Sequence, residues 1–320
     1  MTTAPAVVRL SLLVALLALI AAGIGLFWPG GDGSIELTSL RGEAVELYGR
    51  GIYQHDTRFV GSLNRGTDAA VLLVAIPLLL VATAWYRRGA LRSRLLLAAV
   101  LAYVLYIYAS AALGATASNE LFLVYVALFG ASLFALLRLL TAIDLDDLAT
   151  QISPQAPWRA AGIFMVVCGV VTTAIWLGLG LVPKVLTGQS PEHLDTYATP
   201  VTDALDLGIL TPASFVVGAL LLRRRPLGYL LVIPLLGILA LLAPTFAAQT
   251  FSQTSAGVSF SPAEIIGPIS EFVLLSVVAI RCLAALLHQV DETAWRWRPS
   301  AGASDRMDSA PTTGVMEGVR

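Results

Sequence analysis

Eight long apolar runs constrain this chain more than any other feature of its sequence. Each has about 20 residues, the length that an α-helix needs to cross the hydrocarbon core of a bilayer. They lie at approximately 7–28, 67–86, 93–114, 120–142, 159–182, 204–222, 227–248 and 263–287. Because no water reaches the backbone inside lipid, only a helix satisfies the peptide groups of such a run. The sequence therefore predicts an all-α polytopic membrane protein with eight transmembrane helices.

The composition supports this class and excludes others. Hydrophobic residues make up 57% of the chain and charged residues only 13%, which is not the composition of a water-soluble domain. The formal net charge of −1 gives no electrostatic basis for binding nucleic acid. The lipid bilayer is therefore the predicted partner.

The sequence contains no motif for a cofactor. Cys168 and Cys282 lie in separate apolar runs and have no metal-binding spacing. His55 and His193 lie near acidic residues, but without the tight spacing of a metal site. Walker A, CxxCH, HExxH and GxSxG motifs are all absent from the sequence, as is a mid-span lysine for a retinal Schiff base. We therefore predict no cofactor and no metal site, and no catalytic motif supports an enzyme.

The distribution of basic residues predicts the orientation, since lysine and arginine collect in short cytoplasmic loops. Two short turns, "YRRGALRSR" and "RRRPLG", are dense in arginine and lie on the same side of an eight-span chain. With both termini inside, 15 of the 20 basic residues face the cytoplasm. We therefore predict cytoplasmic N- and C-termini in the cell (plasma) membrane, outer loops at 29–66 and 183–203, an inner linker at 143–158 and a disordered cytoplasmic tail at 289–320.

The two halves of the chain carry matching landmarks. The stretches "TDAAVLLVAIP" (67–77) and "TDALDLGILTP" (202–212) share Thr, Asp, Ala, Leu and Pro at five of eleven positions. We predict a tandem duplication of a four-helix unit, residues 1–142 and 159–288. Because four is an even number of spans, both units have the same orientation, with a pseudo-two-fold axis along the membrane normal.

Acidic residues open these matching stretches. Thr67 and Thr202 have the character of N-caps, which places Asp68 and Asp203 in the first turn, where a carboxylate contributes about 0.3–1 kcal/mol. Asp206 lies on the same face as Asp203 but deeper in the span, where an unpaired carboxylate is costly. It therefore requires a cation, a proton or an arginine. Both a structural and a binding role stay open for these acids.

Glu271 carries the sharpest expectation. It lies seven residues after Glu264, roughly 10 Å deeper along a helix. Pro268 cannot donate to the carbonyl of Glu264, and a broken hydrogen bond beside a membrane acid indicates a cavity rather than lipid. We expect the Glu271 side chain to face the bundle interior and to meet a polar group from the third or sixth span. The alternative is a structural acid, paired with tyrosine or protonated.

Tyr103, Tyr106 and Ser110 form one stripe at positions i, i+3 and i+7 of the third run. Such a stripe either packs through hydroxyl hydrogen bonds or lines a ligand path. Pro77 and Pro212 release backbone carbonyls, which suits a polar site as well as an ordinary kink. The candidate substrate- or ion-binding residues are thus Glu271, Asp206, Asp203, Asp68, Tyr103 and Tyr106.

Three classes of function are compatible with these features. The leading hypothesis is a permease-like protein with a polar, acidic site in the outer half of the bundle, which takes a small polar or cationic solute. The first alternative is a non-transporting accessory or assembly protein with a partner surface on the loop 29–66. The second is a membrane-embedded enzyme or sensor. A water-accessible cavity that reaches Glu271 would favour transport, and a solidly packed bundle would favour the accessory role.

Overall fold

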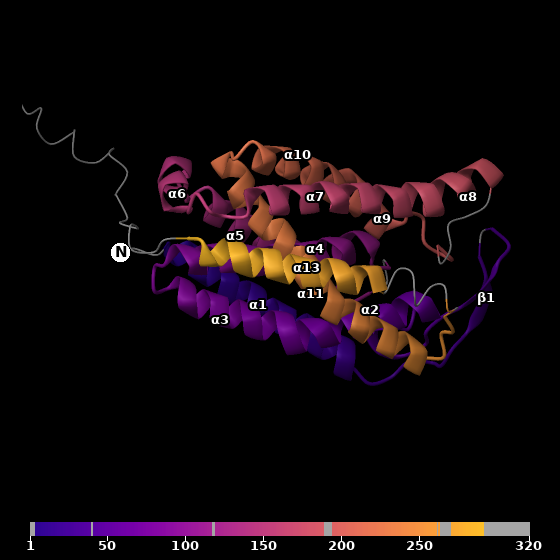
Figure 1. Ribbon diagram of the computed structural model, residues 1–320. Helices are drawn as coiled ribbons and strands as arrows, with labels where there is room; N and C mark the ends of the chain where they lie inside the picture. The colour runs from indigo at the N-terminus through magenta and orange to yellow at the C-terminus, as the bar shows by residue number, and fades with distance from the viewer. Residues whose placement is uncertain are drawn as a thin grey trace, which may run out of the picture.

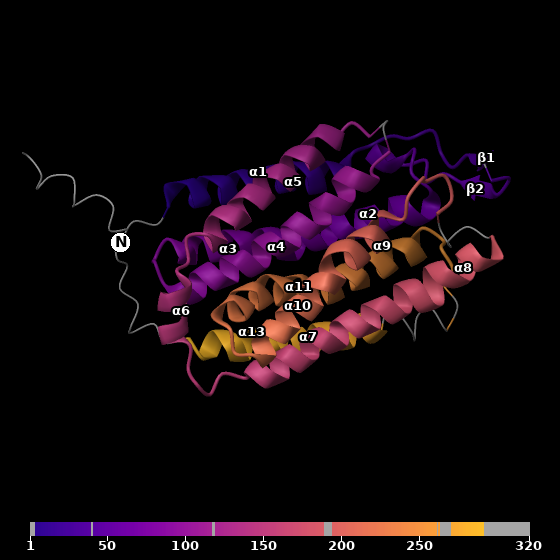
Figure 2. The same cartoon turned by 90° about the horizontal axis from the view of Figure 1, so that it is seen from above.

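The apolar runs form helices that lie side by side in one bundle (Figures 1 and 2). A computed structural model describes residues 4–39, 41–116, 119–188, 194–260, 262 and 270–290. Within these residues, eight helices are long and apolar enough to cross a membrane. The predicted all-α class and the number of candidate spans are confirmed.

The bounds of the elements are as follows: α1 Pro5–Phe27, β1 Glu36–Thr38, β2 Ala44–Glu46, η1 Gly51–Tyr53, α2 Arg58–Ala70, η2 Val71–Ala75, α3 Ile76–Tyr86, α4 Leu91–Gly114, α5 Phe122–Leu140, α6 Leu145–Gln151, α7 Trp158–Thr173, η3 Ala174–Leu181, α8 Val182–Thr187, α9 Val201–Leu205, η4 Asp206–Leu210, α10 Thr211–Leu222, α11 Pro226–Ser255 and α13 Ser270–His288. The segments η2, η3 and η4 are π-helical. The antiparallel β1–β2 hairpin lies at one end of the bundle, referred to as the hairpin end, and α6 lies at the other, the α6 end (Figure 1).

The second span begins earlier than the hydropathy indicated. One continuous helix covers Arg58–Tyr86. Its N-cap is Thr57, whose hydroxyl accepts a backbone N–H at 3.3 Å. The prediction that Thr67 is the cap is therefore wrong, because Thr67 lies inside α2 and donates to a carbonyl of the preceding turn. The polar stretch 58–66 is helical because α2 packs against α11, a tertiary contact that hydropathy does not report.

Each of the three π-helical segments ends two residues before a proline, at Pro77, Pro183 and Pro212. Proline has no N–H to donate and its ring crowds the preceding turn, so a wider turn in front of it relieves the clash. In the two matching stretches, η2 and η4 both begin four residues after the threonine. The stretches 67–77 and 202–212 thus share a local backbone structure as well as a sequence.

The central helix of the bundle is α11. It packs against α2 and α4 of the first half and against α10 and α13 of the second. A Cβ atom at Gly237 would overlap the backbone of Ala99 on α4, and one at Gly66 would overlap the backbone of Gln249 on α11. Small residues at such positions let helices approach closely. The two halves are therefore joined along α11.

The two halves differ in how their flanks are packed. In the first half, α1 packs along α5. In the second half, α7 packs along α10 and α13 packs along α11, but among the described residues no comparably extensive contact joins α7 to α13. Both helices lie on the same side of the bundle (Figures 1 and 2). The flank between α7 and α13 is thus less tightly packed than the flank between α1 and α5.

Candidate functional site

A cavity of about 650 Å³ lies between the two halves. Side chains of α2, α4, α7, η4, α11 and α13 form its walls, and Tyr53 and Tyr197 line it toward the hairpin end. Its volume falls within the roughly 300–1,000 Å³ that is usual for small-molecule sites. The cavity reaches Glu271, which is the arrangement that the sequence analysis associates with transport.

Asp206 forms the first polar group of this cavity, together with Tyr106 and Trp176. The Tyr106 hydroxyl donates to Oδ1 of Asp206 at 2.9 Å, and the Trp176 indole N–H donates to Oδ2 at 3.0 Å. The Asp206 side chain is buried, and no arginine or lysine of the described chain forms an ion pair with it. Tyr106 comes from α4 in the first half, whereas Trp176 comes from η3 in the second. This Asp206 centre therefore links the two halves through neutral donors.

Asp68 forms the second polar group, together with Tyr53 and Tyr125. The Tyr53 hydroxyl donates to Oδ2 of Asp68 at 2.6 Å and lies 3.3 Å from the hydroxyl of Tyr125. Gly25 of α1 faces the carboxylate, and a Cβ atom there would overlap it. All four residues of this Asp68 centre belong to the first half of the chain.

The position of Asp68 differs from the one expected. Asp68 lies ten residues after the start of α2 and is buried, so its interpretation as a first-turn acid is wrong. Asp203 does lie in the first turn of α9 and is half-buried, although Pro200 and not Thr202 is at the N-cap position. The residue whose environment resembles that of Asp68 is therefore Asp206.

Glu271 lines the cavity from the first turn of α13 and is partly exposed. It makes no hydrogen bond or ion pair with another described residue. Glu264 and Pro268, on which part of the expectation for Glu271 rests, lie outside the described residues, as do His193 and the tail from 291. The cavity thus brings together five of the six candidates, Asp68, Asp203, Asp206, Tyr106 and Glu271.

Tyr103 has a different position. Its hydroxyl lies 2.6 Å from the hydroxyl of Thr245 on α11, and Tyr103 is not among the lining residues, whereas Thr245 is. A further bond between the halves runs from the Gln249 amide to the Thr67 hydroxyl at 2.8 Å. These bonds fasten α11 to α4 and α2 along one wall of the cavity.

Sequence reasoning named one of the donors, Tyr106, but missed Tyr53 and Trp176. Tyr53 lies in the outer loop, in the segment "GRGIYQHD", where nothing in the sequence marks a contact with a membrane acid. Trp176 and Tyr125 lie inside apolar runs, where nothing in the neighbouring sequence marks a polar contact. The described residues contain no group of three or more metal-ligating side chains.

A third polar contact lies at the hairpin end. The Tyr197 hydroxyl donates to Oδ1 of Asp56 at 2.6 Å, and Arg41 donates to the carbonyl of Asp195. These contacts, here named the Asp56 latch, fasten the segment 194–200 to the first half. Burial raises the pKa of Asp56 to about 6, although the bond from Tyr197 acts in the opposite direction. Burial, and next the charge of Asp56, raise the pKa of Tyr197 well above its usual value.

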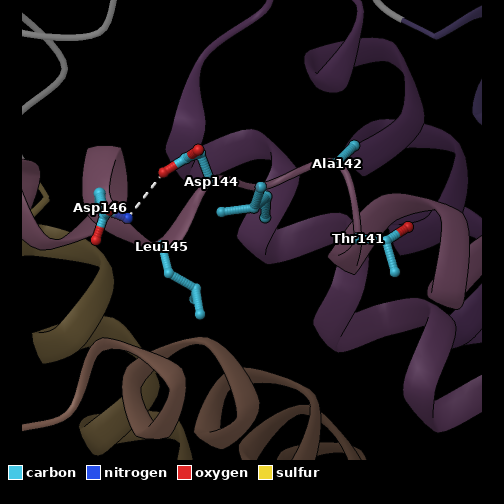
Figure 3. A pocket seen from close by; sticks show the side chains of 6 residues that line it. Thr141, Ala142, Asp144, Leu145 and Asp146 are labelled. Carbon is cyan, nitrogen blue, oxygen red and sulfur yellow. Dashed lines mark hydrogen bonds between the residues drawn. The ribbon is translucent and has the colours of Figure 1, made fainter. Parts of the chain in front are cut away.

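A second hollow, of about 580 Å³, lies at the turn between α5 and α6 (Figure 3). All its lining residues come from the stretch 141–146. The carboxylate of Asp144 accepts the backbone N–H groups of Asp146 and Asp147 at 2.8 and 3.1 Å and so caps α6. Because its acid already serves the helix start and no other element converges on it, this hollow is not a candidate site.

No protein-family model, curated protein or solved structure matches this chain. The class follows from the helices themselves. Their number, length and apolar composition define an integral, multi-pass membrane protein.

Proposed function

We propose that the protein is a permease-like membrane protein that binds a small polar or cationic solute in the cavity between its halves. The observation that carries this proposal is the Asp206 centre. A buried carboxylate faces a cavity and is held by one donor from each half of the chain. Intramembrane carboxylates of this kind commonly mark ion, proton or substrate pathways.

The geometry supports a simple coupling. A cation or proton at Asp206 competes with Tyr106 and Trp176 for the carboxylate oxygens. Because Tyr106 belongs to the first half and Trp176 to the second, such competition weakens one link between the halves. A ligand shifts a conformational equilibrium only by binding its two states differently, and this link supplies the difference.

The architecture we propose for this permease is the tandem duplication of residues 1–142 and 159–288. The shared backbone of 67–77 and 202–212 supports it, and parallel repeats related by an axis along the membrane normal occur in known transporters. With cytoplasmic termini in the plasma membrane, the hairpin end faces outward and the cavity lies in the outer half of the bundle.

The test is charge displacement on a solid-supported membrane. Proteoliposomes that contain the protein receive concentration jumps of ammonium, methylammonium and choline, and separately a pH jump. We expect at least one cation or the proton to displace charge in the wild type, and Asp206→Asn to reduce the signal about tenfold or more. The matched control is Asp146→Asn, which removes the same charge from exposed α6 and should leave the signal intact. A wild type silent to every jump, or an active Asp206→Asn variant, would contradict the proposal.

One observation favours the non-transporting alternative. The outer segment contains an ordered hairpin, in which Glu36 pairs with Glu46, at the end of the bundle (Figure 1). An ordered surface element of this kind suits a partner protein. Under that alternative, deletion of residues 36–46 abolishes recovery of a partner by cross-linking, and Asp206→Asn has no effect on it.

A further inference from the structure

The walls of the cavity differ in chemistry from one side to the other, and this difference bears on the class of solute. We infer that the cavity takes an amphiphilic cation, with one ammonium-type head and one alkyl chain, which reaches it from the bilayer between α7 and α13. This inference rests on the proposed function, because it names the solute class of the same cavity.

The wall formed by α11 and α13 is mainly apolar, although Thr245, Gln249, Thr250 and Gln253 of α11 and Glu271 of α13 also line the cavity. Its lining side chains include Leu235, Leu239, Leu242 and Phe246 of α11 and Phe272 and Leu275 of α13. The rings of Phe246 and Phe272 stack with their centroids 4.1 Å apart. Beside these apolar side chains a hydrated small cation would lose water without gaining a polar partner, which is unfavourable. An alkyl chain meets no such cost.

The other walls carry most of the acidic groups. Asp68, Asp203 and Asp206 line the cavity there and Glu271 lines it from α13, whereas Lys184 is the single basic residue among the described lining side chains. The hydroxyl of Tyr108, a residue only 2% exposed, is buried and has no hydrogen-bond partner among the described residues, and Tyr108 also lines the cavity. The carboxylate oxygens of Asp206 each accept one hydrogen bond, which leaves further lone pairs for a donor. A head that carries positive charge and N–H groups therefore suits these walls.

The route to the cavity follows from which helices and segments are held by hydrogen bonds at each end of the bundle. At the hairpin end, the Asp56 latch ties the segment 194–200 to the first half. At the α6 end, α13 is held by Tyr229, which donates to the carbonyl of Leu286, and by Arg92, which donates to the carbonyl of Val290 at 2.8 Å. Between these ends, the described residues of α7 and α13 lack extensive mutual contact, and both helices line the cavity.

The side chains along this flank suit contact with lipid. Val171 of α7 and Leu275 of α13 line the cavity. Their neighbours Val170 and Leu274 point away from the protein, with 54% and 64% of their surfaces exposed. An alkyl chain that moves from lipid into the cavity therefore stays in apolar surroundings throughout.

The free energies of the chain and of the head indicate that the cavity distinguishes solutes by the charge of the head group. A chain gains little hydrophobic free energy when it moves from lipid to an equally apolar wall. The chain instead keeps the solute in the bilayer, where its local concentration is high, and the acids distinguish a cation from a neutral or anionic head. A short cation does not concentrate in the bilayer, and a fatty acid has an anionic head that the acids repel.

The test measures binding to the full chain in nanodiscs, with dodecylammonium as the probe. Butylammonium is the comparison with a short chain. Dodecanol has the same chain with a neutral head, and dodecanoate has a long chain with an anionic head. Trp176 donates a hydrogen bond to Asp206, so its fluorescence reports on binding at this centre. The signal is the saturable change in tryptophan emission that is lost in Trp176→Phe, and thermal unfolding provides a second readout.

We expect dodecylammonium to bind about tenfold or more tightly than the other three compounds, and Asp206→Asn to weaken its binding. Leu275→Trp, which fills the flank, should slow its association while butylammonium associates at an unchanged rate. If butylammonium binds as tightly as dodecylammonium, the inference is wrong and the proposed function stands. If neither ammonium ion binds at the Asp206 centre, both are wrong. Tight binding of dodecylammonium without charge displacement would retain the solute class and exclude transport.

Discussion

Asp68 and Asp206 are buried to a similar degree, with 5% and 7% of their surfaces exposed, yet they are held in different ways. The donor to Asp68 is Tyr53, and the neighbouring Tyr125 and Gly25 also belong to the first half of the chain. The donors to Asp206 come from both halves. A relative movement of the halves therefore leaves the Asp68 centre intact and alters the Asp206 centre.

This comparison teaches that burial alone does not identify a functional acid. A carboxylate whose partners move together with it stabilises one rigid unit. A carboxylate that two units share senses their relative position, and its occupancy in turn biases that position.

The largest difference is expected in charge displacement. Asp206→Asn should reduce the displaced charge about tenfold or more, because the loss of charged hydrogen-bonding interactions costs about 1.5–3 kcal/mol or more. Asp68→Asn should retain most of the signal, since Tyr53 still finds an acceptor in the amide oxygen. The measurement is the solid-supported membrane assay at equal protein density. Equal losses in the two variants would remove the distinction between the centres.

The next largest effect is expected on stability, from the packing around Asp68. Gly25→Ala places a methyl group where the Asp68 carboxylate lies, and such overpacking costs about 1–3 kcal/mol. Gly23→Ala is the matched control on the same helix, because a Cβ atom there meets nothing within 4 Å. Thermal unfolding in nanodiscs should show a lower transition temperature for Gly25→Ala alone. An unchanged transition would mean that α1 does not hold the Asp68 carboxylate in place.

Tyrosine substitutions sharpen the comparison further. Tyr53→Phe removes the hydroxyl that donates to Asp68 and should lower stability by about 1–2 kcal/mol. Tyr106→Phe should lower it less, because Trp176 continues to donate to Asp206. Thermal unfolding of both variants beside the wild type checks the order. A larger loss in Tyr106→Phe would show that the link between the halves, and not the Asp68 centre, dominates stability.

The fold was largely predictable because lipid imposes one simple requirement. An apolar run of about 20 residues has no alternative to a helix in the bilayer. The same reasoning failed at 58–66, where a polar stretch continues the helix because one face of it packs on α11. Hydropathy reports contact with lipid and not contact with a neighbouring helix.

The candidate site was predictable only in part. Acids in apolar runs are conspicuous, so Asp206 and Glu271 could be found from the sequence. Tyr106 was named from its stripe, but its pairing with Asp206 could not be predicted, because the rotation of each helix and the identity of its neighbours depend on packing across the whole bundle. The sequence predicts a cation, a proton or an arginine at Asp206; among the described residues no arginine forms an ion pair with it, and a tyrosine and a tryptophan donate to it instead.

The smallest effect concerns pH and the Asp56 latch. Asp56 is 1% exposed, and burial raises its pKa from the ordinary 3.8 to about 6. A raised pKa means that the folded protein binds the proton more tightly than the unfolded chain does. The stability that Asp56 contributes is therefore fully present below about pH 3.8 and is lost as the pH rises through 6. Between pH 5 and 7 the loss should be about 1 kcal/mol.

Asp56→Asn is the matched variant, because the amide still accepts from Tyr197 but does not ionise. Thermal unfolding at pH 5, 6 and 7 should show the wild type losing stability relative to Asp56→Asn over this range. A constant difference between the two proteins would mean that Asp56 does not titrate there, and that the latch does not respond to pH.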